Sequence, residues 1–429
     1  MNTSTLLPHS GHVDRRVFLK GTLATATGAL LPNWASLFGS QTVAADMGKR
    51  PRRCILLWMN GGPSQFETFD MKPGRPTGGP FRPIASNVTG IQVSEYLPRI
   101  ARQADKLAII RSMKTLDGNH PAASHILHVG RREPDRSIRH PEIGAMVAKY
   151  LGPADSDLPS YVLTGAGGGY GPGFLGPTYQ PFRVGQDGKL PEFTQSYLSA
   201  PVEARRNDLL RFVEGKFARE HQAEPYETHR AAKEKSWRLL KSRSLFDISK
   251  EWPRYRERYG DSDFGRACLL ARKLVESGVP FVEVGQREYD THGDNFTWHK
   301  ANLQILDPAW AALLEDLHER GLLDDTLVVW MGEFGRSANV NNKAGRDHQV
   351  NGWSVVLAGA GIKGGQIHGA TDIDGRDVKD APVTEGDLFA TIYTALGINP
   401  RTKHYVGTRP VWATTEGAQP IQSLLGGKG

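Results

Sequence analysis

The chain has 429 residues, of which 39% are apolar and 23% charged, and its formal net charge is +7. These proportions are typical of a globular protein with a large core, and they exclude a disordered or fibrous chain. Because the charge excess is small and the Lys and Arg residues are scattered, we expect no nucleic-acid partner.

The N-terminal segment, residues 1–45, is predicted to be an export signal. Arg15 and Arg16 precede a weakly apolar stretch rich in Ala, Thr and Gly, and small residues near Ala45 offer a cleavage site. The segment resembles a twin-arginine signal, which implies the twin-arginine translocase as a partner and a periplasmic or extracellular location. A stable membrane span needs about 20 strongly apolar residues, so we expect none, with an uncleaved anchor as the alternative.

Residues 46–429 then form the mature α/β domain, in which short apolar runs alternate with helical patterns. The expected strands are CILLWMN, KLAIIRS, SYVLTG, VPFVEVG, DTLVVWM and WSVVLAG. Continuous apolar runs between helices indicate a three-layer fold, with a mostly parallel sheet covered by helices on both faces. Cys54 lies in one of these runs and Cys268 in a helical pattern, so we expect two buried thiols.

Two further segments carry local predictions. Residues 166–250 begin with the Gly/Pro-rich stretch GAGGGYGPGFLGPTYQP and continue as charged helices with no expected strand, which predicts an inserted cap beside the core. Further along the chain, a helix is expected to start at Asp307 and Pro308 and to end at Gly321.

Polar clusters stand where the expected strands end. Their candidate site residues are Asn60, Glu67, Asn119, His120, Asp290, His292, Glu333 and His348. Open α/β sheets bind ligands at the carboxyl ends of their strands, so we expect these side chains to share one pocket. Asn119 and His120 also precede Pro121 at the start of an expected helix, whose unpaired amides favour anions.

This combination of residue types predicts a divalent-metal site. Carboxylates, an amide oxygen and imidazoles are the donors that such a site needs, although each residue alone has an ordinary alternative role as a cap, an ion-pair partner or a hydrogen-bonded core residue. None of the spacings matches a closed zinc signature. The mixed donors leave Zn, Ca, Mg and Mn open as the metal.

Five segments, taken in order, resemble one known family. NGGPSQFETFD, SMKTLDGNHPAAS, EYDTHGDNF, GEFGRS and GRDHQVNGW span roughly residues 50 to 410 and are similar to the domain of unknown function 1501 family, within the alkaline-phosphatase and sulfatase superfamily. The resemblance implies an alkaline-phosphatase-like core with two metals. It places Asn60 or Glu67 as the first acid, Asp290 and His292 as a ligand pair, Glu333 as the strand-closing acid and His348 as a distal ligand.

The sequence departs from that pattern at two positions. Phe334 follows Glu333 where the resemblance implies a histidine, so one metal ligand is missing. The nucleophile position falls on Asn119 or His120, with no Ser, Thr or Cys aligned there. The nearby hydroxyls, for which ordinary capping or packing is expected, are Ser112, Thr115 and Ser124.

Two classes of function follow. In the first, the protein hydrolyses phosphate or sulfate esters: a metal-activated water attacks, His120 is base or ligand, and Arg111 or Arg336 holds the anion. A covalent route through His120 is a variant of it. The substrate would be a small anionic ester or a sulfated or phosphorylated glycan. In the second class, the fold binds an anionic glycan or an envelope partner without catalysis.

Overall fold

The computed structural model describes residues 52–133, 137–153, 156–189, 198–220 and 243–426. The predicted signal, residues 1–45, lies outside these ranges. Across the described part of the chain, no helix combines the length and the apolar character that crossing a membrane requires.

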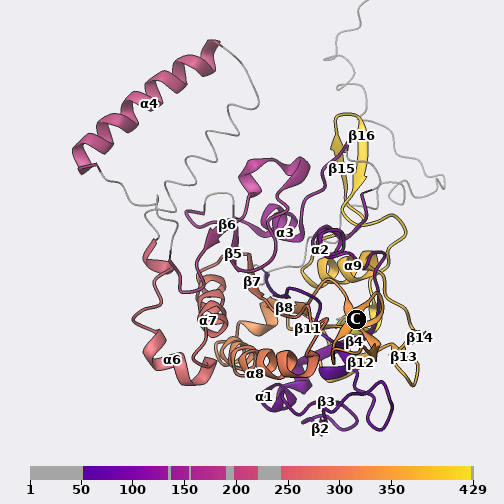
Figure 1. Ribbon diagram of the computed structural model, residues 1–429. Coiled ribbons are helices and arrows are strands. Elements are labelled where there is room, and N and C mark those ends of the chain that lie inside the picture. The colour runs from indigo at the N-terminus through magenta and orange to yellow at the C-terminus, as the bar shows by residue number, and fades with distance from the viewer. Residues whose placement is uncertain (1–51, 134–136, 154–155, 190–197, 221–242, 427–429) are drawn as a thin grey trace, which may run out of the picture. The chain divides into compact units, whose positions relative to one another are not determined.

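Eight of the described strands form the central sheet (Figure 1). In spatial order they are β12 (Gln366–His368), β4 (Leu107–Lys114), β11 (Asn351–Ala358), β8 (Thr326–Met331), β1 (Arg53–Met59), β7 (Phe281–Gln286), β5 (Tyr161–Gly165) and β6 (Phe182–Val184). β11 runs antiparallel to β4 and β8, and the other neighbours are parallel. The mostly parallel sheet predicted from the sequence is therefore confirmed.

Helices cover both faces of this sheet. Every residue of β1 is buried, with Ile55 and Leu57 in one hydrophobic cluster and Leu56 and Trp58 in the other. The first cluster includes side chains of α1 (Pro98–Ala101), α7 (Asp263–Glu276) and α8 (Asn295–Glu319), and the second those of α2 (His120–Val129), α3 (Ile143–Leu151) and α9 (Glu385–Ala395). Full burial of one large apolar side chain stabilises a fold by about 1.5–3 kcal/mol, so the packing on both faces stabilises the sheet.

The remaining described elements are short hairpins, two further helices and single 3-10 turns. The hairpins are β2 (Pro83–Ala85) with β3 (Gln92–Ser94), β9 (Gly335–Val340) with β10 (Arg346–Gln349), β13 (Ala370–Thr371) with β14 (Val378–Asp380), and β15 (Lys403–Val406) with β16 (Arg409–Trp412). The helices are α4 (Ala200–Glu220) and α6 (Trp252–Tyr259). The 3-10 turns are η2 (Gln65–Glu67), η3 (Ala104–Lys106), η4 (Gly173–Leu175), η5 (Pro177–Tyr179), η7 (Arg243–Leu245), η8 (Leu323–Asp325) and η9 (Gln422–Leu424).

The predicted start of α8 is wrong, although its predicted end is right. The helix begins at Asn295 and contains Pro308 in its interior. The Asp307 carboxylate instead accepts the backbone N–H groups of Arg99 at 3.0 Å and Ile100 at 2.8 Å, at the start of α1. A proline forfeits one helical hydrogen bond, and the packing of α8 on the sheet outweighs that loss. Gly321, with φ of 63°, follows the end of the helix in the left-handed conformation.

The inserted segment contains a strand that the sequence did not predict, whereas the two cysteines are buried thiols as predicted. Within residues 166–250, Phe182–Val184 forms strand β6 beside β5, where the sequence predicted no strand. A strand of three residues is too short to give a periodic pattern, and only its partner reveals it. Cys54 and Cys268 are both buried and unpaired, as predicted.

Candidate metal centre

Chain segments that are far apart in sequence meet at one edge of the sheet. β1, β7 and β8 are parallel, and β4 shares their direction because both β4 and β8 are antiparallel to β11. The carboxyl ends of these strands therefore lie at one edge, followed by His120 after β4, Asp290 after β7 and Glu333 after β8. β11 runs the opposite way and starts at this edge, so His348, just before it, arrives there too.

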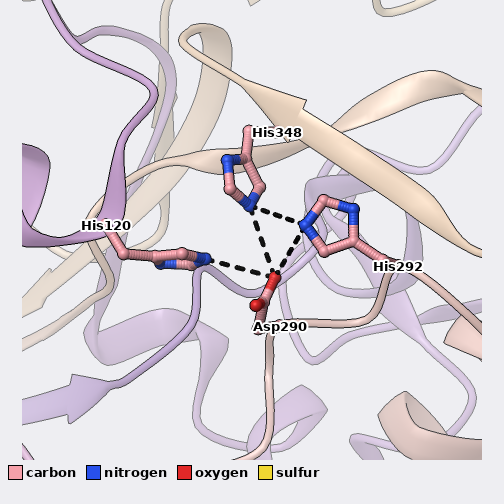
Figure 2. Close-up of side chains that lie close together, drawn as sticks. All are labelled: His120, Asp290, His292 and His348. Atoms are coloured by element: carbon pink, nitrogen blue, oxygen red, sulfur yellow. Dashed lines mark hydrogen bonds and ion pairs between the residues drawn. The ribbon is translucent and has the colours of Figure 1, made fainter.

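Four side chains converge at this edge (Figure 2). One potential ligand atom from each of His120, Asp290, His292 and His348 lies within 4.8 Å of all the others. Nε2 of His120 and Nε2 of His292 each lie 3.2 Å from Oδ1 of Asp290, and Nε2 of His348 lies 3.3 Å from the same oxygen. Three imidazoles thus face a single carboxylate oxygen, and we call these four residues the His/Asp cluster.

The outer nitrogen of each imidazole has its own acceptor. Nδ1 of His120 lies 2.7 Å from Oε1 of Glu333, and Nδ1 of His292 lies 2.8 Å from Oδ1 of Asp347. Nδ1 of His348 lies 2.6 Å from the carbonyl oxygen of Gly118. A carboxylate or carbonyl oxygen only accepts, and these Nδ1 contacts are shorter than the 3.2–3.3 Å approaches of the Nε2 atoms to Asp290, so in a neutral ring the proton lies on Nδ1. In the neutral rings, all three Nε2 atoms therefore turn a lone pair toward the centre.

The side chains around the centre are arranged to surround a cation, because without one their closest atoms repel each other. Nε2 of His292 and Nε2 of His348 are only 3.0 Å apart, and two lone pairs at that distance repel unless a proton or a cation lies between them. Nε2 of His120 is buried and makes no hydrogen bond, because its 3.2 Å approach to Asp290 lacks hydrogen-bond geometry. Imidazoles and a carboxylate are donors that a divalent transition metal takes in proteins.

Charges around the cluster keep Asp290 ionised. Burial alone would raise the pKa of Asp290, but the hydrogen bond and the charge of Arg336 outweigh it and lower this pKa to about 2. Nη2 of Arg336 donates to Oδ1 of Asp290 at 2.7 Å. The hydrogen bond to Glu333 raises the pKa of His120 against the opposing effect of burial, whereas burial and the charge of Arg336 lower the pKa of His348.

Arg336 is itself a structural brace. Its side chain on β9 is fully buried and donates to the carbonyl oxygens of Gly61, of Gly62 at 3.0 Å and of Arg346 at 3.1 Å, besides Asp290. Through these hydrogen bonds, the guanidinium connects the turn after β1 to the His/Asp cluster. It holds Asp290 in place, and its burial removes it from the role of anion holder that the sequence suggested.

Glu333 stands behind the cluster as a support for His120. Its carboxylate is 1% exposed and accepts the backbone N–H of Gly61 at 2.9 and 3.1 Å, in addition to Nδ1 of His120. Gly61 has φ of 109°, and a side chain there would collide with the backbone of Asp290. The close approach of these two turns therefore needs glycine, and it places a donor against the buried carboxylate.

Glu67 was predicted as a metal ligand, but its carboxylate binds other residues of the protein instead. It is fully buried on η2, where Oε1 pairs with Nη2 of Arg346 at 2.9 Å and Oε2 accepts from Asn295 at 3.0 Å. Both carboxylate oxygens are thus occupied by internal partners. Arg346, also fully buried, needs this counter-charge, which explains why an acid stands at this position.

The other three predicted residues lie outside the His/Asp cluster. Asn60, directly after β1, is half-buried, and its Oδ1 lies 3.4 Å from Nε1 of Trp58. Asn119 is the N-cap residue of α2 but makes no side-chain cap. Arg111 belongs to β4, with Nε 3.9 Å from a carboxylate oxygen of Asp70. None of these three side chains is among the four that converge.

Two of the three nearby hydroxyls make internal hydrogen bonds, as the sequence suggested. Oγ of Ser112 donates to the carbonyl oxygen of Ala381 at 2.6 Å, and Oγ1 of Thr115 accepts from Nε1 of Trp353 at 2.7 Å. Ser124 lies one turn inside α2. Sequence reasoning missed the support that Gly118 gives to His348, because a backbone carbonyl leaves no signal in a sequence.

Comparison with known proteins identifies one family and a set of distant structures. A family model described as "Protein of unknown function (DUF1501)" matches residues 51–425. No curated protein sequence matches the chain.

Among solved structures, the PsFucS1 sulfatase from Pseudoalteromonas sp. is 14% identical, with a TM-score of 0.39 over 81% of this chain and 68% of that one. The C-terminal periplasmic domain of EcEptC from Escherichia coli, in complex with Zn, is 9% identical, with a TM-score of 0.40 over 88% and 96%. A protein in the alkaline phosphatase superfamily from Vibrio parahaemolyticus is 12% identical, with a TM-score of 0.38 over 82% and 67%. Because these TM-scores are low, they carry no argument about function, which must be argued from the chain's own side chains.

Proposed function

The chain belongs to the DUF1501 family, and from its metal centre we propose that it is a metal-dependent hydrolase of phosphate or sulfate esters. The observation that carries the proposal is the convergence of three imidazole Nε2 atoms on Oδ1 of Asp290, with every Nδ1 held by an acceptor. Such rings are preorganised to bind a cation, since their tautomer and orientation are fixed before it arrives.

Asp290, His292 and His348 would hold the metal, with His120 as the fourth donor or as a base. When bound, a divalent metal supplies Lewis acidity, which lowers the pKa of water and withdraws charge from an ester oxygen. Of the four metals considered, the three imidazoles favour Zn over Ca, Mg and Mn, which prefer oxygen donors.

His120 has two possible tasks that its surroundings support equally. Glu333 fixes the proton on Nδ1, so Nε2 can either complete the metal site or accept a proton from an attacking water. His120 is also the first residue of α2, so the positive end of that helix lies beside the centre and favours the oxygens of an anionic ester.

The partners and the location of the protein form part of the same proposal. The substrate would be a small anionic ester or a sulfated or phosphorylated glycan. The twin-arginine signal predicted in residues 1–45 would take the protein through the twin-arginine translocase to the periplasm or the cell exterior.

One observation favours the non-catalytic alternative. The Phe334 ring lies 4.8 Å from the ring of His120 and 4.4 Å from that of His348, at the position where the sequence resemblance implies a metal-binding histidine. An aromatic ring there supplies no metal ligand, so the centre has one donor fewer than the resemblance implies. In this alternative, the site binds an anionic glycan without hydrolysing it.

The test is a hydrolysis assay with aryl phosphates and aryl sulfates after chelation and re-addition of Zn, Mn, Mg or Ca. We expect metal-dependent turnover that His292→Ala and His348→Ala abolish, that His120→Ala lowers by about 10²–10⁴-fold, and that Ser124→Ala retains. His318→Ala, on the exposed side of α8, is the matched histidine control. A well-folded, metal-loaded protein with no turnover on any of these esters would refute the proposal, and retained binding of a sulfated glycan would then support the alternative.

A further inference from the structure

A second hollow lies at the same edge of the sheet, over the carboxyl ends of β5, β6 and β7. The cavity has a volume of about 590 Å³ and is lined by residues from these strand ends, from the start of α7 and from the middle of α8. Cavities of about 300–1,000 Å³ are typical of small-molecule sites. The His/Asp cluster uses none of these lining residues.

The polar lining is rich in side-chain amides and nearly balanced in charge. Gln186, Gln286 and Asn302 supply carboxamides, and the charged residues are Asp263, Glu288 and Arg287. Two acids and one base disfavour a sulfate or phosphate group here. Each of the three carboxamides donates one N–H to a backbone carbonyl, that of Gln186 to Gly285 at 3.3 Å. Their second N–H groups and the two carboxylates are instead suited to the hydroxyl groups of a neutral ligand.

The cavity also has apolar walls. Phe264 at the start of α7, Val184 at the end of β6 and Ile305 on α8 contribute to the lining. A ligand with hydroxyl edges and an apolar C–H face matches such a surface, since it can make hydrogen bonds and still bury apolar area.

Side chains of the lining hydrogen-bond to the backbone beside the cavity. Nδ2 of Asn302 donates to the carbonyl oxygen of Glu288 at 2.7 Å, and Nε2 of Gln286 donates to the carbonyl oxygen of Asn302 at 3.1 Å. Glu288 has φ of 77°, an uncommon conformation for a residue with a side chain. Its side chain is exposed at the cavity rim.

The cavity adjoins the metal centre through the chain itself. Glu288 at the rim is two residues before Asp290, a distance of at most about 7 Å for an extended chain, and both side chains are exposed. Tyr289 between them is buried and its hydroxyl donates to Oε1 of Gln286 at 3.1 Å, which anchors the connection. The chain from Glu288 to Asp290 therefore connects the cavity rim to the His/Asp cluster.

From these features we infer that the cavity is a subsite for a neutral sugar ring. The statement that this ring belongs to the same molecule as the hydrolysed ester rests on the proposed function, whereas sugar binding in the cavity does not. The inferred substrate class is thus a glycan or glycoside that carries a phosphate or sulfate group in addition to the neutral ring in the cavity.

The test measures sugar binding to the metal-free protein, in which hydrolysis cannot contribute. Galactose, glucose and lactose are titrated by ligand-observed NMR and calorimetry, with millimolar dissociation constants expected for such small probes. Ile305→Trp fills the cavity and should weaken binding by about tenfold or more, equivalent to about 1.4 kcal/mol. Gln304→Trp adds the same bulk to an exposed neighbouring position of α8 outside the lining and should leave binding unchanged.

Glu288→Gln is the second variant, since it removes the rim charge while its size is kept. We expect weaker binding of all three sugars and no change in metal content. Absence of saturable binding by the unaltered protein, equal binding by Ile305→Trp, or binding of inorganic sulfate at this cavity in preference to sugars would overturn the inference. Ester turnover is measured on the same preparations. Sugar binding without turnover would refute only the proposed function, and turnover without sugar binding would refute only the proposed subsite.

Discussion

His120 and Glu333 form a close pair at the centre of this protein, with Nδ1 of the imidazole 2.7 Å from Oε1 of a carboxylate that is 1% exposed. The same ring presents a buried Nε2 to Asp290 on its other side. The pair gives a direct way to test whether Glu333 acts through His120 instead of binding the metal itself.

Replacement of Glu333 by Gln should weaken metal binding by about 10–100-fold, the usual effect of losing a carboxylate behind a metal-bound histidine. The metal-to-protein ratio at saturation should stay unchanged, because the four converging side chains are intact. Competition with a chromogenic chelator measures the affinity. Asp347→Asn removes the equivalent partner of His292, but Asp347 is far more exposed, with 62% of its side chain accessible, so its effect should be smaller. A loss of stoichiometry in Glu333→Gln would show that Glu333 is a direct ligand.

Metal binding should stabilise the fold. A ligand that binds only the folded state raises the free energy of unfolding by about 2.7 kcal/mol at 100 times its dissociation constant. Urea unfolding in zinc buffers and in chelator measures this difference. We expect His348→Ala to lose the stabilisation and His318→Ala to keep it. Equal stabilisation of both variants by zinc would place the metal at some other site.

Glu67→Ala should destabilise the protein by about 3–5 kcal/mol, because it leaves the fully buried Arg346 without its counter-charge. Glu67→Gln should cost less, since an amide oxygen can still accept from the guanidinium. In both variants the metal content of the folded protein should match that of the unaltered chain. Denaturant unfolding and elemental analysis check the two statements, and a metal-free but stable Glu67→Gln would restore Glu67 as a ligand.

His299 should make stability fall at acidic pH. Its Nε2 accepts the backbone N–H of Ser64 at 2.8 Å, and burial is the main cause that lowers its pKa from 6.5 to about 4. Between these values the unfolded chain binds more protons than the folded one, so this contribution is complete above pH 6.5 and is lost as the pH falls toward 4. The full loss is about 3 kcal/mol.

The comparison is between the unaltered protein and His299→Gln, whose side-chain oxygen can still accept from Ser64 but does not titrate. Free energies of unfolding measured from pH 7 to pH 4 in chelator should fall less steeply in the variant. Chelator is needed because metal binding has its own pH dependence. Parallel curves for the two proteins would contradict the assignment.

Much of the fold could be predicted from the chain because its signals are local. An apolar run such as Cys54–Met59 is buried on both faces wherever it lies in a sheet, and it therefore predicts a central strand without knowledge of its neighbours. Strand β6 and the start of α8 could not be predicted. A three-residue strand is visible only through its pairing with β5, and Asp307 caps a helix that is more than 200 residues away in the chain.

The candidate site was also predictable only in part. Residue types and positions at strand ends determined that His120, Asp290, His292 and His348 stand at one edge of the sheet, because parallel strands bring their carboxyl ends together. Only the tertiary structure decided which acids face them, since a carboxylate takes whichever buried cation or donor the packing sets against it. Glu67 therefore pairs with Arg346 and Glu333 supports His120, although in the sequence both look like ligands.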